Sequence, residues 1–111
     1  LAQGRDHLWA TLREQHLSAF LGRFEQFAQD RVGRAPERPL SQALFDRGRS
    51  YGLLSEQELV GYMLLAWGAG ARPPTPDPEW ILTLMTDPHR TAEDKIRTLF
   101  DLAEQRAGVR A

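Results

Sequence analysis

The sequence predicts an all-α protein: a compact bundle of about five helices, with a long N-terminal helix and a proline-rich connection before the last two. Apolar residues recur at steps of three and four over most of the chain, which is the period of one helix face. No period-two alternation extends beyond a few residues, so we expect no sheet. Clusters of glycine and proline separate the helical segments and mark the connections between them.

The first helix is expected over residues 6–32, where the apolar side chains form one long stripe. Gly22 lies inside this segment and disfavours a helix by about 1 kcal/mol relative to alanine, which does not break it. A loop over residues 33–39 follows, and Gly33 suits a helix C-terminus. A second helix is expected over residues 40–51 and ends at Gly52.

A capping box opens the third helix, which is expected over residues 55–67. The Ser55 hydroxyl can accept a hydrogen bond from the Glu58 amide, and the Glu58 carboxylate can accept one from the Ser55 amide. This helix is apolar nearly all round, which predicts the central buried helix of the fold. Gly61 leaves room for a second helix to approach closely.

The stripe of the first helix is the longest apolar face available to cover the central helix. We therefore expect Phe20, Phe24 and Phe27 to lie near Leu64 and Trp67.

The proline-rich connection covers residues 69–77, and two shorter helices follow it. The fourth is expected over residues 78–86, with Pro78 as its first residue and Asp77 as its cap. The fifth is expected over residues 91–107, starting at Thr91. These two helices are too short to form a core alone, so we expect a single domain over residues 1–111.

Composition limits the classes of function. The net charge is −1, which gives no general attraction to nucleic acid or to an anionic membrane. Cysteine is absent, so disulfides and thiolate sites are excluded. No apolar run approaches the roughly 20 residues that span a bilayer. We expect a cytoplasmic protein that binds neither nucleic acid nor membrane.

No pattern of residues predicts catalysis, a cofactor or a metal, so we expect a protein that is not an enzyme. His7, His16 and His89 lack the spacing of helical zinc ligands. The basic residues Arg38, Arg47 and Arg49 lack an accompanying array of aromatic side chains, which favours a solvated face over a nucleic-acid site.

The aromatic residues are the candidates for binding another protein. The stripe of the first helix either packs on the central helix or leaves its N-terminal part to a partner. Trp67 and Trp80 present the same choice between core and partner. The candidate partner-binding residues are Trp9, Leu12, Phe20, Phe24 and Trp80.

The second half of the chain carries a series of features in a recognisable order. These are Arg47-Gly48-Arg49-Ser50-Tyr51-Gly52, Ser55-Glu56-Gln57-Glu58-Leu59, Tyr62, Gly68, Asp77-Pro78, Trp80-Ile81, Asp87-Pro88, Lys95 and Leu99. The series resembles small helical accessory proteins of Gram-negative bacteria encoded beside type VI secretion spike and adaptor genes. The residues from Ala69 to Pro76 depart from the pattern of that family.

The resemblance implies a non-enzymatic adaptor or accessory protein that contacts a secretion effector, an adaptor or a spike component. An immunity protein that neutralises a bacterial toxin is the alternative. Inhibitors of nucleases are often strongly acidic, to match a basic cleft, and a net charge of −1 does not fit that pattern.

Overall fold

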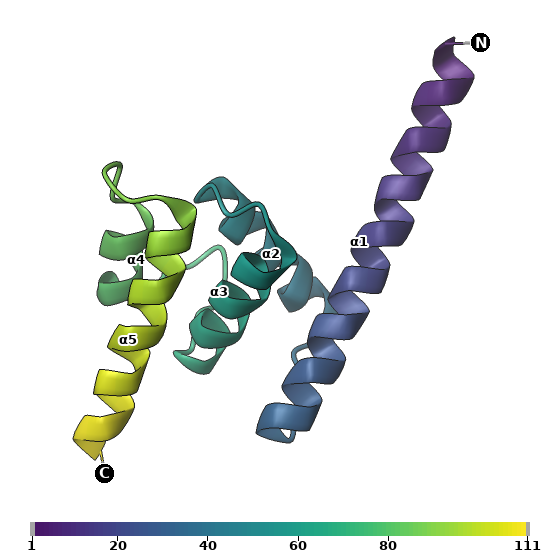
Figure 1. Ribbon diagram of the computed structural model, residues 1–111. Helices are drawn as coiled ribbons and strands as arrows, with labels where there is room; N and C mark the ends of the chain where they lie inside the picture. Colours follow the sequence, from purple (N-terminus) through teal and green to yellow (C-terminus); the bar gives the residue numbers. More distant parts are fainter. Residues whose placement is uncertain (1, 111) are drawn as a thin grey trace. The chain divides into compact units, whose positions relative to one another are not determined.

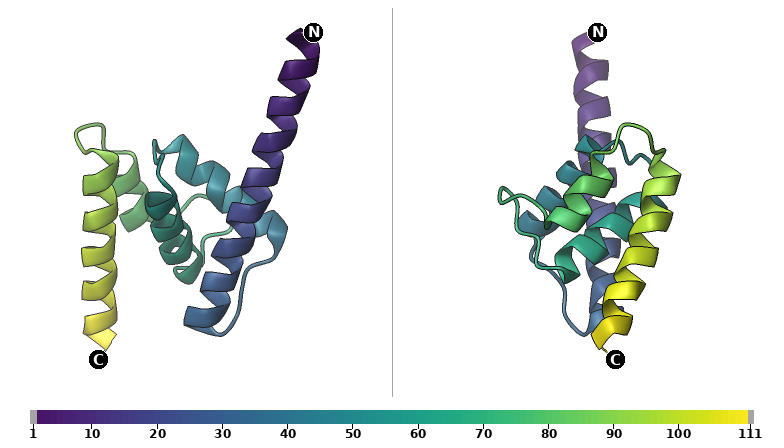
Figure 2. Two further views of the ribbon diagram at one scale, coloured as in Figure 1. Left: turned by 45° about the vertical axis from the view of Figure 1, so that its right-hand side comes forward. Right: turned by 90° about the vertical axis from the view of Figure 1, so that its left-hand side faces the viewer.

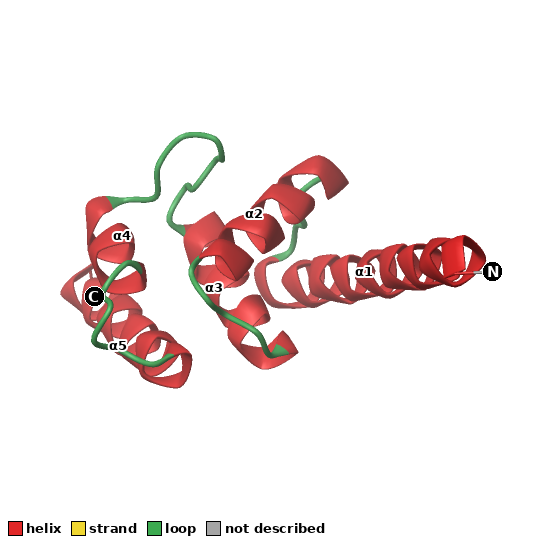
Figure 3. Ribbon diagram, turned by 90° about the horizontal axis from the view of Figure 1, so that it is seen from above, coloured by secondary structure: helices red, strands yellow, loops and turns green. Residues whose placement is uncertain are grey.

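The computed structural model describes the backbone of residues 2–110 and the side chains of residues 15–106. Within that range the chain forms five helices and no strand, which confirms the expected all-α class (Figures 1 and 3). The helices are α1 (Ala2–Val32), α2 (Arg38–Ser50), α3 (Glu56–Gly68), α4 (Glu79–Met85) and α5 (Ala92–Arg110).

The chain divides into two compact units, residues 1–38 and residues 39–111. The first unit consists of α1, the loop after it and Arg38, the first residue of α2. Arg38 turns back onto α1, where its Nε and Nη2 atoms donate to the Glu25 carboxylate over 2.9 Å and 3.1 Å. Its Nη1 atom donates to Ser18 Oγ over 3.0 Å. The expectations of a single domain and of contact between the α1 stripe and the central helix both stay predictions.

Helix starts that depend on local chemistry lie where the sequence predicts them. Glu58 N donates to Ser55 Oγ over 3.1 Å and Ser55 N donates to Glu58 Oε1 over 3.3 Å, which confirms the capping box. At α5, Asp94 N donates to Thr91 Oγ1 over 3.1 Å. The turns after α1 and α2 use Gly33 and Gly52 with positive φ, as expected for helix ends.

Two helices begin earlier than expected. The first starts at Ala2 rather than at residue 6 and continues without interruption through Gly22. The second starts at Arg38, so Pro39 belongs to its first turn and not to the preceding loop. Proline is tolerated there because backbone amides in the first turn of a helix have no intrahelical acceptor.

The second unit is built around α3 and α5. Helix α5 packs against both α3 and α4 (Figures 1 and 2). Side chains from all three helices are buried, namely Leu59, Tyr62, Met63, Ala66, Ile81, Leu84, Met85, Ile96 and Leu99. The close approach expected at Gly61 is made by α5, because a Cβ atom built on Gly61 would lie 3.0 Å from Phe100 Cε2.

Helix α2 joins this unit through a second close approach. A Cβ atom on Gly48 would lie 3.0 Å from Leu59 Cδ2 and 3.1 Å from Tyr62 Cδ2, so a larger residue there would require these side chains to shift. Along α3, Tyr62 and Met63 are fully buried, whereas Leu64 is half-buried. Leu64 is therefore less buried than its neighbours in the centre of α3.

Candidate functional site

The buried carboxylate of Asp77 accepts hydrogen bonds from three other side chains of the second unit. Its Oδ1 atom accepts from Arg47 Nη1 over 3.0 Å, and its Oδ2 atom accepts from Tyr51 OH over 2.8 Å and from Tyr62 OH over 2.6 Å. Arg47 Nη1 also donates to Thr75 O over 2.7 Å. We call Arg47, Tyr51, Tyr62 and Asp77 the Asp77 cluster. It fastens the proline-rich connection to α2 and α3.

Both tyrosines of the Asp77 cluster resist ionisation. Burial and the hydrogen bond to the Asp77 carboxylate raise the pKa of Tyr51 to about 12. The same two causes, in the same order, raise the pKa of Tyr62 further. The rings also make an edge-to-face contact, with centroids 5.5 Å apart. At neutral pH both hydroxyls therefore remain neutral donors to the carboxylate.

The cluster corrects one expectation from the sequence. Asp77 does not cap α4: that helix begins at Glu79, and Pro78 precedes it without a side-chain cap. The carboxylate is directed instead to the arginine and the two tyrosines. Two basic residues of α2 form ion pairs with different carboxylates: Arg47 pairs with Asp77, and Arg38 pairs with Glu25.

Sequence reasoning missed the Asp77 cluster, although every member belongs to the features that carry the family resemblance. Lys95, another of these, donates from Nζ to Tyr51 O over 3.3 Å and so joins α5 to the end of α2. The signal available in the sequence was that these residues belong to one series of features; their convergence in space follows from the packing. Their role is to hold the fold, because the Asp77 side chain is wholly buried.

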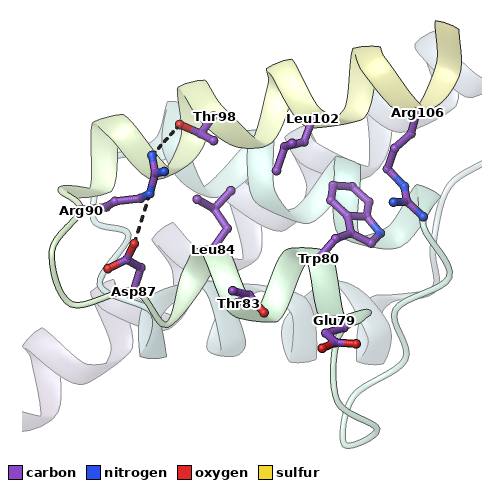
Figure 4. A pocket seen from close by; sticks show the side chains of 9 residues that line it. All are labelled: Glu79, Trp80, Thr83, Leu84, Asp87, Arg90, Thr98, Leu102 and Arg106. Carbon is purple, nitrogen blue, oxygen red and sulfur yellow. Dashed lines mark hydrogen bonds and ion pairs between the residues drawn. The ribbon is translucent and has the colours of Figure 1, made fainter. Parts of the chain in front are cut away.

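A groove between α4 and α5 is the candidate binding site. Its cavity has a volume of about 700 Å³. Trp80, Leu84 and Leu102 line the middle (Figure 4). The remaining lining residues are polar or charged: Glu79, Thr83, Asp87, Arg90, Thr98 and Arg106. We call this cavity the Trp80 groove.

One end of the Trp80 groove is closed by an internal ion-pair network. Arg90 binds the carboxylates of Asp87 and Asp94 over 3.3 Å and 2.9 Å, and donates to Thr98 Oγ1 over 3.0 Å (Figure 4). A hydrogen bond from the His89 amide and the nearby Arg90 lower the pKa of the Asp87 carboxyl. The charges at this end are therefore engaged within the chain.

The other end of the groove is formed by Trp80 and Arg106. The Arg106 guanidinium carbon lies 4.6 Å from the centroid of the Trp80 ring, a cation–π contact. A smaller cavity of about 380 Å³ adjoins the same pair, and α3 contributes Leu64, Leu65 and Gly68 to its lining. Trp80 therefore lies between two hollows of the surface.

The structure places Trp80, a candidate partner-binding residue, in a cavity. Trp80 is half-buried and lines the Trp80 groove. The side chains of Trp9 and Leu12 lie outside the described residues, and for Phe20 and Phe24 on α1 partner contact stays a prediction. Trp67 of α3 is buried.

Among the described residues no group of three or more His, Asp or Glu side chains could hold a metal ion. In the described part of the chain, none of the helices is long and apolar enough to cross a membrane. Comparison of the chain with protein-family models, with curated proteins and with solved structures found no match.

Proposed function

We propose that the chain is a non-enzymatic protein-binding module, a cytoplasmic accessory or adaptor protein of a type VI secretion system. Its partner would be a secretion effector, another adaptor or a spike component. The Trp80 groove is the observation that carries the binding role. The resemblance of the second half of the chain to accessory proteins encoded beside spike and adaptor genes supports the assignment to secretion.

The chemistry of the second unit supports binding rather than catalysis. The Asp77 carboxylate has all its described partners inside the fold, and the raised tyrosine pKa values keep both hydroxyls protonated. Of the two carboxylates that line the groove, Asp87 is held by Arg90 and Glu79 has no ion pair to a described residue. Hydrolysis by paired carboxylates needs two that converge on the substrate.

The mixed apolar and polar lining of the groove suits an amphipathic helix as the bound segment. An amphipathic helix can lay apolar side chains on Trp80, Leu84 and Leu102, with its polar residues toward Thr83 and the solvent. Tryptophan and arginine are enriched among the residues that dominate binding energy. Trp80 and Arg106 would then form the anchor.

The test is binding between the purified chain and the spike, adaptor and effector proteins encoded beside its gene, measured by isothermal titration calorimetry. We expect Trp80→Ala to weaken binding by roughly 30-fold or more, as for a hot-spot residue. Thr83→Lys should also weaken it, because Thr83 is exposed and a longer side chain there obstructs the groove. Leu54→Ala is the control, since Leu54 is 71% exposed and does not line the groove.

Absence of binding to all of these proteins would overturn the proposal. Binding to a toxin, together with loss of that toxin's activity, would replace the adaptor role by that of an immunity protein. Equal affinity of the wild type, Trp80→Ala and Thr83→Lys would remove the groove from the binding site.

A further inference from the structure

The Trp80 groove carries two charges that remain unpaired within the described part of the chain. Glu79 and Arg106 both line the groove near Trp80 (Figure 4), and no ion pair to a described residue engages either of them. The other two charges of the lining, Asp87 and Arg90, neutralise each other. One free acid and one free base therefore lie near one aromatic side chain.

This arrangement is self-complementary. In an interface with two-fold symmetry every contact occurs twice. If one residue of the first copy contacts a different residue of the second copy, the same two residues also meet with the copies exchanged. Two copies facing each other across Trp80 can place Glu79 of each against Arg106 of the other. We infer that the Trp80 groove binds a second copy of this chain and forms a homodimer with two reciprocal Glu79–Arg106 ion pairs.

The contact between Arg106 and Trp80 is compatible with these ion pairs. A cation–π contact uses the face of the guanidinium, whereas its five N–H donors lie in the plane. The edge of Arg106 can therefore bind a carboxylate while its face stays on the indole. Trp80 and Leu102 supply apolar surface at the centre, with charges at the rim, which is the usual composition of protein interfaces.

The inference goes beyond the proposed function, because it names what occupies the groove when no other protein is bound. It is connected with the proposed function in one respect: a partner helix and a second copy would compete for the Trp80 groove. Dimer formation needs no partner, so it is tested with the purified protein alone.

The experiment is sedimentation velocity of the full chain over a dilution series, with two charge reversals. We expect the wild type to dimerise, and Glu79→Arg or Arg106→Glu to raise the dimer dissociation constant about 100-fold, since each places like charges together twice. An equimolar mixture of the two variants should dimerise again. In that mixed dimer one copy supplies both bases and the other supplies both acids.

Asp101→Arg is the matched control: it reverses a charge on an exposed residue of α5 that does not line the groove, and it should dimerise as the wild type does. A wild type that stays monomeric throughout the series would overturn the inference. So would failure of the mixture to dimerise, or single reversals that dimerise normally. A monomeric wild type would leave the binding of secretion proteins to be decided by its own titration.

Discussion

Asp77 shows how a local preference yields to packing. An aspartate directly before a proline and an apolar helical pattern is a good cap by sequence. The fold turns the carboxylate inward, where an arginine of α2 and tyrosines from two segments bind it within a wholly buried site. A buried charge is tolerated when it is paired and hydrogen-bonded.

Asp77→Asn should lower the free energy of unfolding by about 3 kcal/mol, because the largely buried Arg47 loses its counter-charge. Urea unfolding followed by circular dichroism measures the change. Asp101→Asn, on the exposed face of α5, is the control and should stay within about 0.5 kcal/mol of the wild type. A value that small for Asp77→Asn would contradict a structural role of the Asp77 cluster.

The two tyrosines predict a loss of stability at alkaline pH. Their pKa values are higher in the folded protein than the ordinary value of 10.0, with that of Tyr51 at about 12. The folded state therefore keeps protons that the unfolded state releases, so the stabilisation is complete below pH 10.0 and is lost as the pH rises through about 12.

Thermal unfolding at a series of pH values checks this dependence. The decline above pH 10.0 should be clearly smaller in Tyr62→Phe, which removes the hydroxyl whose pKa is raised most. A decline of the same size in the variant would show that other groups cause it.

Close approach of helices decides the packing of the second unit. Both Gly48 and Gly61 let a neighbouring helix lie at a distance that a Cβ atom would obstruct. The neighbours differ in their freedom to move. Tyr62, beside Gly48, is buried and bound to Asp77, whereas Phe100, beside Gly61, is 44% exposed.

Gly48→Ala should therefore destabilise the protein by about 1–3 kcal/mol, because the buried Leu59 and Tyr62 would have to shift within packed surroundings. Gly61→Ala should be nearly neutral. Phe100 can swing outward there, and alanine gains about 1 kcal/mol of helix propensity over glycine. Chemical denaturation of both variants checks the order, and a Gly61→Ala at least as destabilised as Gly48→Ala would contradict it.

The chain as a whole is expected to fold as one domain, although it divides into units of residues 1–38 and 39–111. A single helix has no core of its own, so the apolar stripe of α1 needs cover from another surface. If the second unit supplies that cover, the chain unfolds in one cooperative transition, with equal calorimetric and van't Hoff enthalpies. Two separate transitions in scanning calorimetry would contradict the single domain.

Trp9 near the start of α1 offers a second test of this organisation. If that end of the helix is reserved for a partner, Trp9→Ala should change the free energy of unfolding by no more than about 0.5 kcal/mol, as at a surface site. Binding of the partner should weaken. Severe destabilisation of Trp9→Ala would place its side chain in the core instead.

The sequence by itself determined the helical class, the five segments and the capping box of Ser55 and Glu58. These features depend on residues within about one helical turn of each other, so their chemistry can be read along the chain. Trp80 was identified as an aromatic candidate on the same basis. Its groove was not, since Glu79 and Arg106 line one cavity only when α4 packs on α5.

Only the tertiary structure decided the role of Asp77. Its partners lie 15 to 30 residues away along the chain, on two helices and the turn that ends the first of them. From the sequence alone, each of these residues has only a local role: Asp77 as a helix cap, Tyr51 at a helix end and Arg47 in a basic patch. In the folded protein the arginine and the tyrosines bind the Asp77 carboxylate instead. A charge removed from water needs hydrogen-bond donors, and the packing of the helices supplies them.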